Sequence, residues 1–72
     1  MIKEKRREKG LTQSKLAKNL GITKGYLSKL ENHPDFCNPN VNLLLKLSKE
    51  LEIHPIKIFL FFIKNRITTD KN

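Results

Sequence analysis

Residues 11–32 have the sequence LTQSKLAKNLGITKGYLSKLEN, and this stretch decides the fold. Apolar residues recur at helical spacing in both of its halves, which predicts one helix over residues 13–20 and a second after Thr23. Thr12 and Thr23 each precede a helix, where a hydroxyl oxygen can accept a hydrogen bond from an amide of the first turn. Gly21 tolerates the left-handed conformation that ends a helix. The stretch therefore predicts two short helices joined by a tight turn.

The apolar side chains expected to lock these two helices together come from both helices and from the turn. They are Leu16, Ala17, Leu20, Ile22, Leu27 and Leu30. Ala17 is small at the point where the helices are expected to cross. Two helices held at a fixed angle leave the outer face of the second one free to enter a major groove of DNA.

Helices are also expected on both sides of this pair. Residues 2–9 form a polar helix that stops at Gly10. Asn40 can cap a fourth helix, whose apolar residues repeat at helical spacing: Val41, Leu44, Leu45, Leu47 and Leu51. Pro55 suits the first position of a fifth helix, which reaches about Asn65, because proline there forfeits no helical hydrogen bond.

The pattern predicts an all-α protein with five helices in one domain. Residues 32–39 contain two prolines and two asparagines, so we expect a loop there. The domain covers residues 1–66, with the helix-turn-helix at about 12–31 and the fifth helix at about 55–65. The polar residues 67–72 are expected to form a flexible tail.

Charge is unevenly distributed along the 72 residues, which carry a formal net charge of +8. Residues 1–30 contain nine Lys or Arg against Glu4 and Glu8, whereas the remainder is close to balanced. A concentrated basic surface attracts polyanions, of which nucleic acid is the commonest. A solvated basic face without a partner is the alternative that charge alone leaves open.

Several classes of protein are disfavoured. Cys37 is the sole cysteine, which excludes a disulfide framework and fits a reducing cytoplasm. His33 and His54 are far apart and lack a second cysteine, so no metal site is expected, and no cofactor is implied. No group of acid, base and nucleophile suggests an enzyme. The apolar run 56–63 is too short for a membrane span, which needs about 20 residues.

The fifth helix is apolar nearly all round, whereas a surface helix needs only one apolar stripe. We expect Ile56 and Phe59 to fill the core, and Leu60, Phe62 and Ile63 to contact a second copy of the chain. Such a two-fold dimer would place two recognition helices about 34–36 Å apart and predicts a palindromic or repeated DNA site.

Taken together, the threonine caps, the turn glycine and the later Asn38-Pro39-Asn40-Val41 resemble the Cro/C1-type (Xre) helix-turn-helix family over about residues 2–60. The tract 24–28 is similar to biofilm and sporulation repressors of this class. The short length and the apolar last helix are similar to controller proteins of restriction–modification systems. The resemblance implies the compact five-helix fold of Cro/C1 repressors and operator DNA as the partner.

The resemblance also implies which residues contact DNA. They are Thr12, Gln13, Thr23, Lys24, Gly25, Tyr26, Ser28, Lys29 and Asn32. Gln13 matches a phosphate-holding position that can also brace a neighbouring side chain, and Lys24 and Lys29 match positions that face base edges. Simpler alternatives stay open: either lysine can contact phosphate alone, and the Tyr26 ring can pack beneath its helix. Gln13 can be an exposed residue at a helix start, Gly25 a neutral change, and Asn32 an ordinary turn residue.

Two further features concern the scaffold. In related repressors the residues matching Arg6 and Glu31 form a partly buried ion pair between the first and third helices, and we expect the same here. The sequence departs from the family in Lys5, where an apolar residue is usual, and in a loop at 33–37 that is about two residues longer. Phe36 is the expected apolar anchor of that loop.

The function predicted from these features is a cytoplasmic transcriptional regulator, a repressor or autoregulator, that binds double-stranded operator DNA as a homodimer. An antitoxin that binds a partner toxin and its own promoter is the alternative, since antitoxins use the same fold. A second regulatory protein is a further possible partner. The sequence does not separate these functions.

Overall fold

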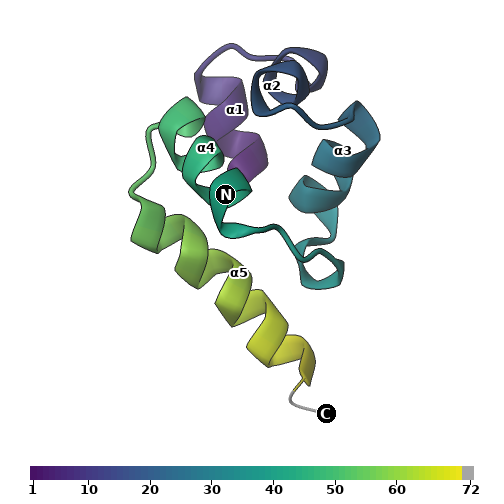
Figure 1. The fold of residues 1–72 in the computed structure, drawn as a ribbon, viewed down its shortest axis with the longest axis vertical. Coiled ribbons are helices and arrows are strands. Elements are labelled where there is room, and N and C mark those ends of the chain that lie inside the picture. The colour runs from purple at the N-terminus through teal and green to yellow at the C-terminus, as the bar shows by residue number, and fades with distance from the viewer. Residues whose placement is uncertain (71–72) are drawn as a thin grey trace.

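A computed structural model describes the backbone of residues 1–70 and the side chains of residues 1–65. The described part is entirely helical, as predicted, with five α-helices and one short 3-10 helix around a common core (Figure 1). Their bounds are α1 Ile2–Glu8, α2 Gln13–Leu20, α3 Lys24–Asn32, η1 Pro34–Phe36, α4 Val41–Leu51 and α5 Pro55–Asp70. None of the helices in this part of the chain is long and apolar enough to cross a membrane.

The caps that were predicted around the helix-turn-helix are confirmed. Thr12 Oγ1 accepts a hydrogen bond from the Lys15 amide at 3.0 Å, and Thr23 Oγ1 accepts one from the Tyr26 amide at 3.0 Å. Gly21 ends α2 with φ +73°, in the left-handed region that costs a residue with a Cβ roughly 1 kcal/mol or more. Local chemistry therefore fixes both ends of the turn.

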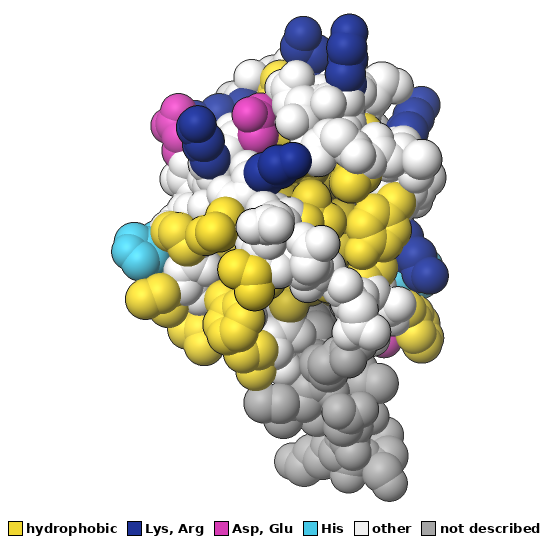
Figure 2. All heavy atoms as spheres, viewed as in Figure 1, with side chains coloured by type: hydrophobic (Ala, Val, Ile, Leu, Met, Phe, Trp, Pro, Cys, Tyr) yellow, Lys and Arg dark blue, Asp and Glu magenta, His cyan; other side chains and the backbone are white. Residues whose placement is uncertain are grey.

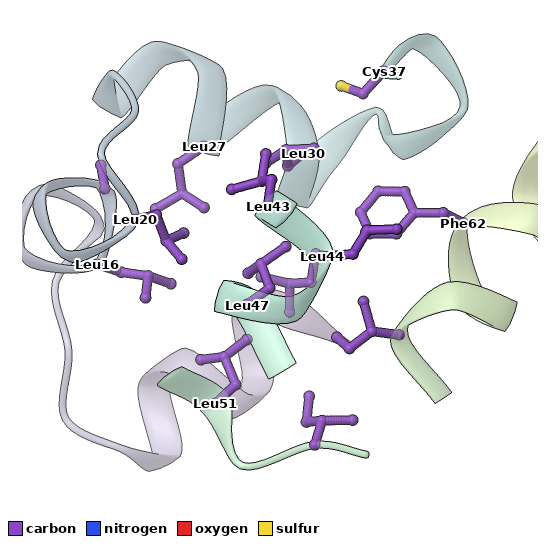
Figure 3. Close-up of a cluster of buried hydrophobic side chains, with 14 residues drawn as sticks. Leu16, Leu20, Leu27, Leu30, Cys37, Leu43, Leu44, Leu47, Leu51 and Phe62 are labelled. Atoms are coloured by element: carbon purple, nitrogen blue, oxygen red, sulfur yellow. The ribbon is translucent and has the colours of Figure 1, made fainter. Parts of the chain in front are cut away.

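The core is built around α4, which contacts α1, α2 and α5. Figure 3 shows leucines from α2, α3 and α4 directed toward one another, with Phe62 of α5 closing the cluster. Eight side chains are almost fully buried: Ile2, Leu16, Leu20, Leu27, Leu30, Leu47, Leu51 and Ile58. Each contributes about 1.5–3 kcal/mol through removal from water, so the angle between α2 and α3 is rigidly held.

Two residues of α4 lie on a different face from the one expected. Val41 is 63% exposed and Leu45 is 50% exposed, whereas Leu43, absent from the predicted set, is buried. The inner side of α4 carries Leu43, Leu44, Leu47 and Leu51. Most residues in the first half of α4 are apolar, and one face of a helix cannot present all of them to a single core. The predicted apolar stripe was therefore too wide.

The face of α5 was also predicted wrongly. Ile56 and Phe59, expected in the core, are exposed, and Ile58 and Phe62 are buried in their place. Ile58 and Phe62 are four residues apart and so lie on the same side of the helix. Phe62, which was expected to contact a partner, is thus committed to the core of its own chain.

The C-terminal helix is longer than predicted, since α5 continues to Asp70 instead of ending near Asn65. It projects from the bundle formed by the other helices, as the green-to-yellow ribbon of Figure 1 shows. The last two residues of the predicted tail, 71–72, lie outside the described residues.

The loop after α3 contains a short helix that the proline content did not predict. Pro34 occupies the first position of η1, and the Cys37 amide donates to the Pro34 carbonyl at 3.2 Å. η1 packs against α5, which buries Cys37 and leaves Phe36 67% exposed. The loop thereby supports α5 from the side of α3.

An ion pair joins α1 to α3, as the family resemblance implied. Arg6 Nε lies 2.7 Å from Glu31 Oε2, and Arg6 Nη1 donates to the Leu11 carbonyl at 2.9 Å. Gln13 Nε2 donates to the other carboxylate oxygen of Glu31 at 2.9 Å. The Glu31 side chain is 0% exposed, and its charge is satisfied by groups from α1 and α2.

We expect Glu31→Ala to lower the free energy of unfolding by about 3–5 kcal/mol, because Arg6 would be left buried without its counter-charge. Glu50→Ala is the control, since Glu50 accepts a single exposed hydrogen bond from Asn19 and its loss costs about 1 kcal/mol or less. Denaturant unfolding measures both values. Equal destabilisation by the two variants would refute the structural importance of the pair.

Candidate nucleic-acid interface

The outer face of α3 is cationic and accessible. Lys24, Gly25 and Lys29 are exposed, and Ser28 is partly exposed, while Leu27 and Leu30 on the inner side are buried. Glu31, the acidic residue of this helix, is turned inward to Arg6 and leaves no carboxylate on that face. The helix therefore presents donors without a competing negative charge.

Gly25 has no structural role inside the described chain. A Cβ at this position would meet nothing within 4 Å, and its backbone does not adopt a positive φ. Glycine costs a helix about 0.5–1 kcal/mol relative to alanine, and no compensation comes from packing. No contact within the described chain thus explains the glycine, and close approach of a DNA strand stays the prediction for this position.

Tyr26 packs partly against the core and partly faces solvent. Its ring lies against the buried cluster, and no hydrogen bond from its hydroxyl is found among the described residues. Burial raises the pKa of the Tyr26 hydroxyl, so the group remains a neutral donor at physiological pH. The Tyr26 ring therefore supports α3 from the core side, and contact of its hydroxyl with DNA stays a prediction.

One polar hollow lies between α1 and the starts of α2 and α3, and we call it the α1 hollow. It has a volume of about 400 Å³ and is lined by Lys3, Arg6, Arg7, Thr12, Gln13, Ser14 and Lys24. Cationic side chains and hydroxyl or amide groups together suit an anion such as a backbone phosphate. The structure thus brings three of the predicted DNA-contacting residues, Thr12, Gln13 and Lys24, to one hollow.

A second polar hollow lies beside the turn and the start of α4, and we call it the α4 hollow. It also has a volume of about 400 Å³. Its lining residues are Leu20, Gly21, Ile22, Tyr26, Asn38, Asn40, Asn42, Leu43 and Lys46. Asn40 uses its side-chain oxygen to cap α4 through the Leu43 amide at 2.8 Å. Each hollow includes one residue of α3, Lys24 in the first and Tyr26 in the second.

Two predicted DNA-contacting residues have internal partners that sequence reasoning missed. The Gln13 amide is bound to Glu31, so Gln13 is held by the ion pair that joins α1 to α3. Asn32 accepts a hydrogen bond from Lys3 Nζ at 3.1 Å and donates to the Ser28 carbonyl at 3.0 Å. Long-range pairs of this kind leave no local signal in the sequence.

Lys3 and Arg7 of α1 were not identified as site residues from the sequence, although both line the α1 hollow. Their spacing of four residues was the available signal, because it places both side chains on one side of a helix. Among the described side chains no group of His, Cys, Asp and Glu could hold a metal ion.

An exposed helix that is locked across a glycine turn by a second helix defines a DNA-binding helix-turn-helix domain. The Helix-turn-helix family model matches residues 2–58. The chain belongs to the Cro/C1-type (Xre) helix-turn-helix family of transcriptional regulators.

Similar proteins are regulators and an antitoxin. The chain is 40% identical over 52 residues to the HTH-type transcriptional regulator SinR of Bacillus subtilis (strain 168). This match covers 72% of this chain and 46% of the relative, and the match to SinR of Bacillus licheniformis has the same identity and coverage. It is 40% identical over 48 residues to Antitoxin HipB of Escherichia coli O6:H1, covering 67% of this chain and 49% of the relative. The chain therefore spans about half the length of these curated relatives. No solved structure matches significantly.

Gly25→Ala should separate stability from DNA binding. We expect the substitution to raise the free energy of unfolding by about 0.4–1 kcal/mol, because alanine fits the helix and the space around it is open. The same variant should bind DNA more weakly, because the added methyl group occupies the position of the approaching strand. Thermal unfolding and fluorescence anisotropy with labelled duplex measure the two effects. A variant that is more stable and binds equally well would show that Gly25 has no role in recognition.

Proposed function

We propose that this protein is a transcriptional regulator, a repressor or autoregulator, that binds double-stranded operator DNA as a homodimer in the cytoplasm. The observation that carries the proposal is the cationic face of α3 with a polar hollow on each side of it. Family membership supports the same function.

The two hollows suit the two backbones that border a major groove. When a recognition helix lies in the groove, the elements on either side of it meet the phosphates of opposite strands. Lys24 and Lys29 then face base edges, where an ammonium group can donate to guanine O6 and N7. Thr23 and Ser28 offer hydroxyls beside them. The hollows position the helix, and the lysines supply preference among bases.

An apolar surface on α4 and α5 supports the homodimer. Ile56, Phe59 and Leu60 are exposed, and with the half-buried Ile63 they occupy positions i, i+3, i+4 and i+7, which is a continuous stripe on one side of α5. Val41 and Leu45 of α4 continue the surface across a groove of about 180 Å³, and Figure 2 shows hydrophobic side chains gathered there.

The proposed interface retains Leu60 and Ile63 from the sequence prediction and leaves out Phe62, which is buried. It adds Ile56 and Phe59, which were expected in the core from the sequence. Large apolar side chains grouped on a small domain are typical of surfaces that a partner covers. Helix-turn-helix dimers bind half-sites about 34–36 Å apart, so a two-fold dimer formed through this stripe would suit a palindromic site.

Similarity to Antitoxin HipB supports a second candidate function, in which the protein binds a toxin as well as its own promoter. The exposed Phe36 on η1 is a surface available for such a partner. Affinity purification of the tagged protein from its host, followed by mass spectrometry, tests this candidate. A stoichiometric partner that the Phe36→Ser variant fails to retain would support it.

Selection of bound duplexes from a random library should recover a palindromic or repeated sequence with wild-type protein. Lys24→Ala should reduce the preference at one base position per half-site by about 1 kcal/mol, or roughly fivefold, because a donor to the base edge is lost. The control is Lys49→Ala, which removes the same charge from the last turn of α4.

We expect Lys49→Ala to leave the selected sequence unchanged. Identical selected sequences for Lys24→Ala and wild type would overturn the assignment of Lys24, and failure of wild type to select any sequence would overturn the proposed function.

Phe59→Lys should convert the dimer to an 8.4 kDa monomer without unfolding it, because Phe59 is 48% exposed and contributes little to the core. Sedimentation equilibrium at micromolar concentration gives the mass, and circular dichroism confirms the helical content. Lys57→Ala, on the same helix but outside the stripe, should remain dimeric. A monomeric wild type would exclude the homodimer.

A further inference from the structure

The cations of α1 are divided between two sides of the helix. Lys5 lies 3.6 Å from Glu8, and Lys9 lies 2.6 Å from Glu52 at the end of α4, so both are neutralised by carboxylates. Arg6 is turned inward to Glu31. The paired cations are thus accounted for by contacts within the domain.

Lys3 and Arg7 differ from these cations. They lie four residues apart on the side of α1 that lines the α1 hollow, and Lys24 of α3 lines the same hollow. Arg7 makes no ion pair or hydrogen bond through its side chain within the described residues, and Lys3 binds only the neutral Asn32. Like charges at this spacing destabilise a helix, and neither Lys3 nor Arg7 has an ion pair within the described residues that would offset this cost.

No carboxylate of the described residues forms an ion pair with Lys3 or Arg7, although the amino group of Met1 and, to a lesser extent, the charge of Lys3 lower the pKa of Glu4. The two glutamates of α1 are engaged elsewhere, Glu4 with the amino group of Met1 at 2.7 Å and Glu8 with Lys5. Glu31 lies behind the hollow, with its side chain 0% exposed and bound to Arg6 and Gln13. The α1 hollow therefore presents three cations to an anion that the described chain does not contain.

We propose that α1 is itself a DNA-contacting element, in which Lys3 and Arg7 bind a backbone phosphate that flanks the base pairs read by α3. This inference rests on the proposed function and adds to it a contact outside the helix-turn-helix. Lys24 shares the hollow with both residues, so the phosphate lies next to the strand read by the first turn of α3. α1 extends the contacted backbone beyond the recognition helix and fixes how α3 is placed along the groove.

The test compares two double variants that remove the same charge. Lys3→Ala/Arg7→Ala removes the two cations of the hollow, and Lys5→Ala/Lys9→Ala removes the two that pair with carboxylates. Affinity for the duplex selected by wild-type protein is measured between 50 and 200 mM salt. Each phosphate contact contributes about 0.9 to the salt slope, and the dimer would lose one contact in each of its two half-sites. Over this fourfold range the affinity of the first variant should therefore fall about 12-fold less than that of wild type. The second variant should follow wild type.

Arg7→Ala alone provides a variant that should leave the fold intact, because the Arg7 side chain makes no hydrogen bond or ion pair with another described residue. We expect it to show half of the change in slope at an unchanged melting temperature. Ethylation interference locates the contact, since wild type should be sensitive at a phosphate flanking each half-site and the Lys3→Ala/Arg7→Ala variant should not be.

The outcomes separate this inference from the proposed function. If wild type selects a duplex and both double variants change the salt slope equally, the effect is one of net charge and the α1 contact is refuted. Unchanged interference at the flanking phosphates in Lys3→Ala/Arg7→Ala refutes it as well. If wild type selects no duplex, the proposed function itself fails.

Discussion

The buried ion pair between Arg6 and Glu31 is the constraint on which the remaining structure depends. It crosses from α1 to α3, holds the Leu11 carbonyl through the same guanidinium, and fixes Gln13 at the start of α2. A buried charge tolerates few arrangements, because every donor and acceptor around it must be satisfied. The pair therefore specifies how three helices meet at one end of the domain, while leucines that could pack in several ways fill the rest.

This constraint also determines the chemistry of the surface. Because Glu31 is used internally, α3 keeps its lysines without a neighbouring carboxylate, and the start of α2 lies beside the cations of α1. A single interaction thus stabilises the scaffold and removes negative charge from the face that carries the predicted contacts. The proposed recognition surface depends on the same residue, Glu31, that stabilises the scaffold, whereas the fold does not require a glycine at position 25.

The helix-turn-helix could be predicted closely because its signals are local: threonine caps, a glycine at positive φ and apolar residues at helical spacing. The orientation of α5 could not, because a helix that is apolar nearly all round gives no periodic signal, and only packing against α4 and η1 selects Ile58 and Phe62. For the candidate site, the sequence predicted which residues belong to it but not which side chains they contact. The partners of Gln13 and Asn32 depend on contacts across 18 and 29 residues of sequence, which no local pattern reveals.

Glu52 has a backbone conformation that is uncommon for a residue with a side chain, with φ +54° at the end of α4, and its carboxylate neutralises Lys9. This ion pair contributes to an asymmetry, because positive charge is neutralised by carboxylates on one side of α1 and is not paired with a carboxylate on the other. A molecule charged in this way has an electric dipole, and the field of a polyanion rotates it during diffusion. Under the proposed function, this dipole would favour collisions in which the unpaired cations of α1 and the exposed face of α3 meet DNA first, and the Lys9–Glu52 pair would thereby raise the rate of productive encounter.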